Sequence, residues 1–400
     1  MAPSLVGTDF RIAIGYESFG PYHLARLNSV ARRAPLLAIE FSRKSSIYGW
    51  QPTETKDFHT ETLSRDAMRA RFSDIAAKLD KALSEFHPDV VFVPGWAAAE
   101  ALAMLRWCRR AGVTAVVMSD SQEIDAPRVA LKESLKGALL RQFDGAFVAG
   151  ERHAAYLTKL GFHDRPVARG YDVVDNRHFA PSPMTPPPSS RELFLCCARL
   201  VAKKNLVVLL EAFRLFVDRV GTAAAPPLVI VGEGPMRAAI ENERDRLGLK
   251  NVVKIPGFSE YAALPTFYQN ARCFILPSSV EQWGLVVNEA MAAGCPVLVS
   301  ERAGCVPELV RKGENGFTFD PTSPRALAEK MFTLHQNPEI LDRFGAKSME
   351  IVAAHGLEAH VSSVLALTNA MPARSLVKNT LGQNLILHVL LMQALKERRI

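Results

Sequence analysis

Short apolar runs alternate with amphipathic stretches along most of the chain, and this alternation restricts the fold more than any other feature. Strand-like runs at 90–93, 114–118 and 146–149 are separated by helical periodicity at 97–110 and 128–143. Continuously apolar runs are typical of strands buried on both faces of a parallel sheet. Strands separated by helices form βαβ units, whose helices cover both faces of the sheet. Further elements of this type are expected at 10–15, 22–33 and 64–86.

A proline-rich segment interrupts this pattern near the middle of the chain and predicts a domain boundary. Residues 180–190 hold five prolines, which suit neither a helix interior nor an inner strand. The alternation then restarts, with strands expected at 193–197, 228–231, 252–255, 273–276 and 296–300 and helices at 206–219 and 236–247. We therefore predict two Rossmann-like doubly wound α/β domains that face each other across a cleft. The expected parts are an N-terminal domain (1–170), a linker (171–190), a C-terminal domain (191–370) and a helical tail (371–400).

The tail is apolar at 384–392 and basic at 396–399. We expect its helix to cross back and cover the N-terminal domain. The alternative is an interfacial helix in peripheral contact with the inner face of an anionic membrane.

Composition narrows the class of protein. The 400 residues are 48% apolar and 22% charged, with a net charge of +7, which is typical of a soluble globular protein. Basic and acidic residues are interspersed, so we expect no nucleic-acid partner. The six cysteines have no metal-ligand spacing, and residues 1–9 lack a signal-peptide pattern, so we expect a cytoplasmic protein with buried, reduced thiols.

The strongest candidate site begins at Glu281 and ends at Glu289. An apolar strand-like run at 272–276 precedes Glu281, and Gly284 permits a tight turn into a helix that begins at Leu285. The N–H groups at such a helix start favour an anion, and the carboxylates suit hydroxyl groups. This combination predicts a sugar-nucleotide site.

Two cations are expected at the same edge of the sheet. Arg199 and Lys204 follow the strand at 193–197, and parallel strands end on one side of their sheet. Arginine binds phosphate oxygens bidentately, whereas lysine acts as a compact charge, so the pair suits a diphosphate. An exposed basic loop is the alternative explanation of this segment.

Weaker candidates follow other strands. Gly232 lies in a tight turn without a complete dinucleotide fingerprint, and Phe258 is either a wall for a base or a core residue. In the first domain, Gly20 and Asp120 are candidates on the acceptor side, whereas His153 is expected to be structural.

These motifs together resemble the GT-B-fold retaining glycosyltransferases of family 4 (glycosyl transferases group 1). The resemblance rests on Arg199 with Lys204, on 232–235, and on Glu281 and Glu289 with seven residues between them, and it is strongest over 190–365. Relatives commonly place a glycine pair where this chain has Gly20 and Pro21, and a histidine where it has Ser119 and Asp120. Asp120 is therefore a candidate replacement for that histidine.

The resemblance implies transfer of a hexose-type unit from a nucleotide diphosphate sugar to a glycan or lipid-linked acceptor, in polysaccharide or glycoconjugate biosynthesis. It assigns the diphosphate to Arg199 and Lys204, the ribose to Glu289, and the transferred sugar to Glu281. The amides of Gly284 and Leu285 would contact sugar and phosphate, and neither a metal nor another cofactor would be required. A sugar-nucleotide epimerase, a phosphorylase and a non-catalytic partner subunit of the same fold are the alternatives.

Overall fold

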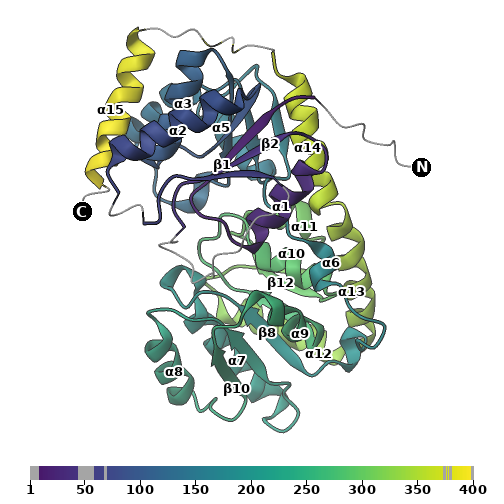
Figure 1. Cartoon of the computed structure of the whole chain (residues 1–400). Helices are drawn as coiled ribbons and strands as arrows, with labels where there is room; N and C mark the ends of the chain where they lie inside the picture. Colours follow the sequence, from purple (N-terminus) through teal and green to yellow (C-terminus); the bar gives the residue numbers. More distant parts are fainter. Residues whose placement is uncertain are drawn as a thin grey trace. The chain divides into compact units, whose positions relative to one another are not determined.

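The computed structural model describes residues 9–43, 58–66, 70–372, 375, 377 and 381–397. Its contacts divide the chain into two compact units, each built around one parallel sheet. Unit 1 comprises 1–173 with 357–400, and unit 2 comprises 174–356 (Figure 1). The predicted fold class of two parallel-sheet α/β domains is confirmed. That the two domains face each other across a cleft stays a prediction.

Unit 1 contains a seven-stranded parallel sheet in the order β3-β2-β1-β4-β5-β6-β7. The strands are β1 (Ile12–Tyr16), β2 (Leu36–Glu40), β3 (His59–Thr62), β4 (Val90–Pro94), β5 (Thr114–Ser119), β6 (Gly145–Val148) and β7 (Val167–Arg169). β1, β2 and β5 are buried along their whole length, as expected for continuously apolar runs. The sequence did not reveal β2, β3 and β7, of which β3 and β7 are short and more exposed edge strands.

Helices cover both faces of this sheet, and several begin or end away from the predicted positions. They are α1 (Pro21–Ala31), α2 (Phe72–Phe86), α3 (Ala99–Ala111), α4 (Ala130–Leu140), α5 (Glu151–Lys159), α14 (Leu357–Ala370) and α15 (Leu381–Glu397), with the short 3-10 helix η1 (Glu123–Asp125). The helix predicted at 64–86 begins only at Phe72, and part of its predicted first turn lies outside the described residues. α14 packs against α1, β6 and β7.

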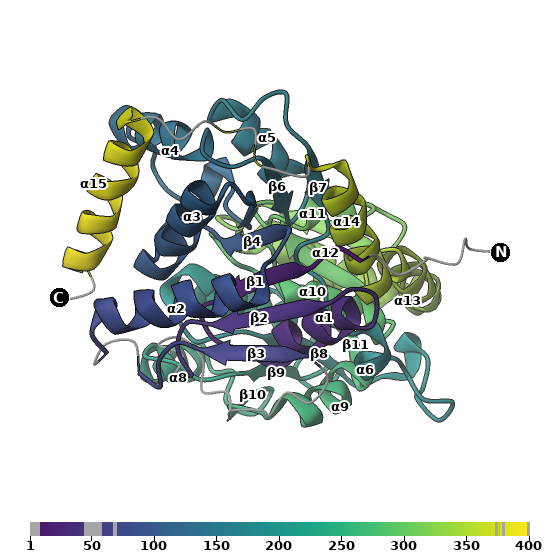
Figure 2. The same cartoon turned by 45° about the horizontal axis from the view of Figure 1, so that its top comes forward.

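The last helix, α15, belongs to unit 1 and lies along α3 (Figure 2). Leu387 and Leu391 of α15 are buried in the same core cluster as Leu79 and Leu105. Leu385 and Val389 of the same helix are exposed. Whether α15 also contacts a membrane stays a prediction.

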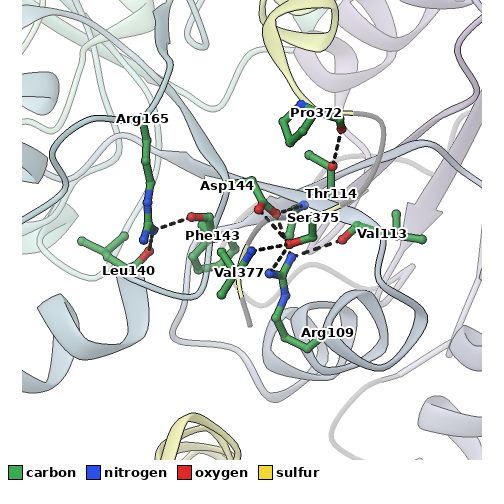
Figure 3. A network of polar contacts seen from close by, with 11 residues as sticks. Arg109, Val113, Thr114, Leu140, Phe143, Asp144, Arg165, Pro372, Ser375 and Val377 are labelled. Atoms are coloured by element: carbon green, nitrogen blue, oxygen red, sulfur yellow. Dashed lines mark hydrogen bonds and ion pairs between the residues drawn. The ribbon is translucent and has the colours of Figure 1, made fainter. Parts of the chain in front are cut away.

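A buried ionic network holds the chain between α14 and α15 (Figure 3). Arg109 pairs with Asp144 at 2.8 Å, and both side chains are almost completely buried. The Ser375 hydroxyl accepts a hydrogen bond from Arg109 at 2.5 Å and donates one to Asp144 at 2.7 Å. Thr114 donates to the carbonyl oxygen of Pro372 at 3.0 Å. The segment that follows α14 is therefore fixed to α3, β5 and the start of β6.

Unit 2 contains a six-stranded parallel sheet in the order β10-β9-β8-β11-β12-β13. The strands are β8 (Leu193–Cys197), β9 (Leu228–Val231), β10 (Val253–Gly257), β11 (Ala271–Leu276), β12 (Val297–Ser300) and β13 (Gly316–Phe319). The α-helices are α6 (Asn176–Phe179), α7 (Leu206–Val220), α8 (Arg237–Arg246), α9 (Leu264–Gln269), α10 (Leu285–Ala292), α11 (Val306–Leu309), α12 (Pro324–Gln336) and α13 (Pro338–Ala353), and η2 (Pro188–Ser190), η3 (Ala202–Lys204) and η4 (Tyr261–Ala263) are 3-10 helices. The apolar side of α7 packs on α12 and on the central strands.

The contacts divide the chain differently from the predicted domain boundaries. The predicted C-terminal domain extended to 370, but α14 packs on unit 1, because its buried face contains Val361, Val364 and Leu365 in the core with β1. The predicted linker at 171–190 contains residues packed into unit 2. Phe179 and Pro188 are buried there, and η2 contacts α13 and β11.

Within the described residues, one helical stretch, Pro338–Ala370, is long and apolar enough by length and composition to cross a membrane. It includes α13 and α14, and 44% of its apolar window is buried in the protein. Core helices of globular proteins pass the same test, so the finding is weak evidence for a membrane span.

Candidate functional site

The cation-bearing loop of unit 2 lies beside the loop of Glu281 because of the strand order. β8 pairs with β11, and both strands end at the same edge of the sheet. Arg199 and Lys204 follow β8, and Glu281 follows β11. The pairing of β8 with β11 therefore places these residues at one edge of the sheet, as the sequence predicted.

Lys204 and Glu281 form a short, largely buried ion pair. The Ser278 hydroxyl donates a second hydrogen bond to the Glu281 carboxylate at 2.9 Å. The backbone links the same two loops, since the Ser279 N–H donates to the Lys203 carbonyl oxygen at 2.9 Å. A charged pair that is removed from water and held by further hydrogen bonds has a fixed geometry. Lys204 and Glu281 are thus positioned before any ligand arrives.

Gly284 makes the sharp turn between this loop and α10. Its φ of 105° is unfavourable for other residues, and an added Cβ would lie 3.0 Å from the Leu276 side chain. α10 then begins at Leu285, so the N–H groups of its first turn point toward the end of β11. The positive partial charge of this helix start favours an anion at this place, beside the Lys204–Glu281 pair.

Glu289 lies in the middle of α10 and is completely buried. The Tyr268 hydroxyl, from α9, donates a 2.5 Å hydrogen bond to Glu289 Oε2. Tyr268 is itself buried and packs edge-on against Phe179. The orientation of the Glu289 carboxylate is therefore controlled by an aromatic residue that the sequence analysis missed, because Tyr268 follows no motif and resembles an ordinary apolar helix residue.

The two remaining unit 2 candidates have different environments. Gly232 has a φ of 143°, and a Cβ there would lie 1.8 Å from the Ala198 carbonyl oxygen, so the turn after β9 must approach the loop after β8 closely. The Leu200 N–H donates to the Glu233 carbonyl oxygen at 2.9 Å across this approach. Phe258 follows the edge strand β10 and is 54% exposed, so it is not a core residue.

One of the two unit 1 candidates, Asp120, lies at a cavity at the carboxyl ends of β1, β4 and β5. Asp120 lines this cavity of about 390 Å³. Burial within the cavity walls, followed by the charge of Asp172, raises the pKa of Asp120 to about 6. Gly20 precedes α1, and its N–H donates to His23 Nδ1 at 3.1 Å. His23 also lines the cavity, and sequence reasoning missed it, although it follows the first predicted strand within a few residues.

His153 has the structural position that was expected. It is completely buried, and its Nδ1 accepts a hydrogen bond from the Gly150 N–H at 3.1 Å at the start of α5. All six cysteines are free and buried. Burial raises the pKa of Cys196 and Cys295 to about 12, which suppresses thiolate chemistry. Among the residues that the structure describes, no group of three His, Cys, Asp or Glu side chains could hold a metal ion.

Comparison with known proteins places this geometry in context. Residues 183–350 match the family model of Glycosyl transferases group 1. The chain is 29% identical over 204 residues to the putative colanic acid biosynthesis glycosyltransferase WcaL of Escherichia coli (strain K12), which covers 50% of this chain and 49% of that protein. The chain therefore spans about half the length of this curated relative.

Solved structures extend the similarity to the whole fold. Sucrose-phosphate synthase from Thermosynechococcus elongatus superposes with a TM-score of 0.71 at 17% identity, over 90% of this chain and 98% of that chain. HepE from Anabaena in complex with UDP has a TM-score of 0.70 at 17% identity, over 90% and 100% of the two chains. The chain thus contains a Glycosyl transferases group 1 domain within the two-unit α/β fold of GT-B glycosyltransferases.

Proposed function

We propose that this protein is a glycosyltransferase that moves a sugar from a nucleotide diphosphate sugar to a glycan or lipid-linked acceptor in polysaccharide biosynthesis. The observation that carries the proposal is the buried Lys204–Glu281 pair in front of the start of α10. It combines a cation, an anion-favouring helix end and a carboxylate within one group 1 domain. The name of the relative WcaL refers to synthesis of a polysaccharide, and HepE was solved with UDP, which supports a uridine nucleotide as the first donor to test.

Arg199 and Lys204 take the diphosphate in this proposal. As the bond from the sugar to the phosphate breaks, negative charge collects on the leaving diphosphate, and fixed cations stabilise it without reorganisation. The backbone N–H groups of Gly284 and Leu285 add to this stabilisation at the helix start. These charges make a metal ion unnecessary, and we propose a reaction without metal or other cofactor.

The two glutamates have separate roles. Glu281 accepts hydrogen bonds from hydroxyls of the transferred sugar, and Lys204 links this contact to the diphosphate because the two side chains are paired. Glu289, held by Tyr268, accepts from the ribose hydroxyls. Phe258, with its exposed ring, is the proposed wall for the base.

We further propose that the enzyme retains the anomeric configuration, as expected for family 4. The acceptor attacks from the face that the diphosphate leaves, and a departing phosphate oxygen takes the acceptor proton. No protein base is then required next to the reacting carbon.

Nucleotide binding and transfer with the full chain test the proposal. UDP and GDP are compared first for thermal stabilisation, which reaches about 2.7 kcal/mol when the ligand is at a hundred times its Kd. Labelled UDP-glucose, UDP-galactose, UDP-N-acetylglucosamine and GDP-mannose are then incubated with candidate acceptors. We expect one donor to give an acceptor-dependent product, whose anomeric configuration is read by NMR.

The same assay separates the alternatives. An epimerase converts the donor without any acceptor, and a phosphorylase requires inorganic phosphate. A partner subunit without activity shows neither reaction. Full activity of Glu281→Ala would remove the proposed role of that glutamate.

A further inference from the structure

The segment that leads the chain into unit 2 lies against the helices of the candidate site. Unit 2 begins at Val174, and α6 (Asn176–Phe179) follows directly. α6 contacts both α9 and α10, the helices that carry Tyr268 and Glu289 (Figure 1). A connecting segment between domains usually lies on the surface and makes few contacts. The contacts of α6 therefore suggest a role beyond connection.

His178 of α6 holds the short helix η4, which precedes α9. Its ring stacks on Tyr261 of η4 with 4.2 Å between the ring centroids and 4° between the planes. His178 Nε2 also lies 3.1 Å from the Tyr261 carbonyl oxygen, and because a carbonyl oxygen only accepts, this nitrogen donates. A stacked ring pair and a hydrogen bond to the backbone of the same residue fix η4 relative to α6.

Phe179 extends this packing toward Glu289. The side chain is completely buried and lies edge-on to two rings. The centroid of Tyr261 is 5.6 Å away at an interplanar angle of 90°, and that of Tyr268 is 5.7 Å away at 86°. Tyr268 in turn donates to the Glu289 carboxylate. The rings of α6 thus support the residue that orients Glu289.

Hydrogen bonds on both sides of α6 attach it to the body of unit 2. At its start, the Asn176 side chain donates to the Val352 carbonyl oxygen of α13 at 2.8 Å. Just after its end, the Ala180 carbonyl oxygen accepts from Gln269 Nε2 of α9 at 3.0 Å. Because α6 is anchored on α13, it can hold η4 and α9 in place.

These contacts reach one half of the candidate site. η4 follows Phe258, the proposed wall for the base, and Glu289 is the proposed partner of the ribose. Burial, followed by the charge of Glu289, raises the pKa of Tyr261, so this ring lies in the field of that carboxylate. The Lys204–Glu281 pair is held by hydrogen bonds of its own loops. A change in α6 should therefore act on the nucleoside more than on the diphosphate.

From this geometry we propose that α6 positions the nucleoside half of the donor, with His178 and Phe179 as the positioning residues that hold η4 and α9 beside Glu289. This role rests on the proposed function, because the ligand is taken to be a nucleotide diphosphate sugar. The support that His178 gives to α9 can be measured without any nucleotide.

Calorimetric titration of the full chain tests the effect on the nucleoside. The ligands are UDP and GDP and their 2′,3′-dideoxy forms, which lack both ribose hydroxyls. For the nucleotide that binds the wild-type protein, we expect His178→Ala to raise the Kd about tenfold. The Kd of its dideoxy form should rise less than about threefold, because the hydroxyls that Glu289 is proposed to bind are already absent.

Two further variants identify the cause of this effect. His178→Phe keeps a ring for the stack on Tyr261, and we expect its Kd to stay within about threefold of the wild-type value. His335→Ala is the matched control, since His335 of α12 packs edge-on against Phe216 at 5.5 Å and 86° in the same unit. It should leave the Kd values unchanged. Equal losses of affinity in His178→Ala and His335→Ala, or for the nucleotide and its dideoxy form, would overturn the proposal.

Hydrogen exchange without nucleotide tests the support itself. We expect the amides of α9 to exchange at least about tenfold faster in His178→Ala than in the wild-type protein, and those of α7 to keep their rates. Unchanged exchange in α9 would contradict the role of His178 alone. A wild-type protein that binds neither UDP nor GDP would contradict the proposed function, and with it the nucleotide role of α6, whatever the exchange of α9.

Discussion

The two units present their carboxylates in opposite ways. In unit 2, Glu281 is largely buried and paired with Lys204, and Glu289 is buried and bound by Tyr268. In unit 1, Glu17 and Asp120 line a cavity. A buried carboxylate that is held by hydrogen bonds is fixed in one orientation and suits a constant ligand. The fixed carboxylates of unit 2 therefore fit the nucleotide sugar donor of the proposed function.

The largest effect expected from breaking the unit 2 arrangement comes from Lys204→Ala. The change removes the cation that is paired with Glu281 and proposed to stabilise the leaving diphosphate. We expect kcat to fall by about 10²–10³, the usual loss for one preorganised group of this kind. The measurement is the transfer rate at saturating concentrations of the donor identified by the screen.

The neighbouring lysine is the matched control for this variant. Lys203 lies in the same short helix and donates to Gln282 at 2.9 Å. We expect Lys203→Ala to keep kcat within about threefold, because Lys203 donates to the uncharged Gln282 amide and is not paired with Glu281. Equal losses of kcat in both variants would mean that the structure of the loop, and not the charge of Lys204, determines the rate.

The turns of the two units also differ in how closely they pack. Gly232→Ala would place a Cβ 1.8 Å from the Ala198 carbonyl oxygen, and we expect it to lower the free energy of unfolding by about 3 kcal/mol. Gly95→Ala, at the unit 1 cavity, has its nearest neighbour 4.0 Å away and a φ of 66°, so we expect a loss of only about 1 kcal/mol. Chemical denaturation of the full chain compares them. Similar losses would show that the unit 2 turn can relax.

Tyr268→Phe tests the orientation of Glu289. The variant keeps the ring that packs on Phe179 and removes the hydroxyl that donates to Glu289. We expect the KM for the donor to rise about tenfold while kcat stays within about twofold, because one hydrogen bond to a charged group is lost. Removing a ribose hydroxyl from the donor should raise the KM less for the variant than for the wild-type protein.

A second tyrosine–glutamate bond provides the control. Tyr156 donates to Glu133 at 2.7 Å in unit 1, between α5 and α4. We expect Tyr156→Phe to leave the donor KM unchanged. Tyr268→Phe could instead lower the free energy of unfolding while the donor that lacks a ribose hydroxyl raises the KM as much as it does in the wild-type protein. In that case Tyr268 supports the core and does not position Glu289.

For a physical reason, the sequence predicted the arrangement of the unit 2 loops better than the residues of the unit 1 cavity. Buried strands directly precede Arg199, Lys204 and Glu281. Because β8 pairs with β11, these residues come together at one sheet edge, and no other tertiary contact had to be predicted. Gly284 could be assigned to a tight turn because few residues adopt its backbone conformation. Tyr268 could not be found in this way, because its role depends on the packing of α9 against α10.

The elements that the sequence misassigned lack a local signal. The edge strand β3 is only partly buried, so its residues carry no continuous apolar run. α14 has an ordinary apolar face. The sequence of such a helix does not indicate whether it packs on β6 and β7 of unit 1 or on the sheet of unit 2. The cavity residues Glu17 and Trp96 lie in loops and His23 lies in the first turn of α1, and only the folded structure shows that they share a cavity.

The smallest expected effect concerns pH and distinguishes Asp120 of unit 1 from the ion-paired Glu281 of unit 2. The pKa of Asp120 is raised to about 6 by burial and by Asp172, and lowered to a smaller extent by His153, while Asp125 raises it slightly. Because this pKa lies above the value of an unfolded aspartate, folding stability falls as the pH rises between about 4 and 6.

We therefore expect Asp120→Asn to remove this part of the pH dependence, measured by chemical denaturation of the full chain across the same pH range. The fall in the free energy of unfolding should stay below about 1 kcal/mol, because the cavity is partly open to water, which screens the carboxylate. An unchanged pH profile in Asp120→Asn would assign the titration to another group at the cavity.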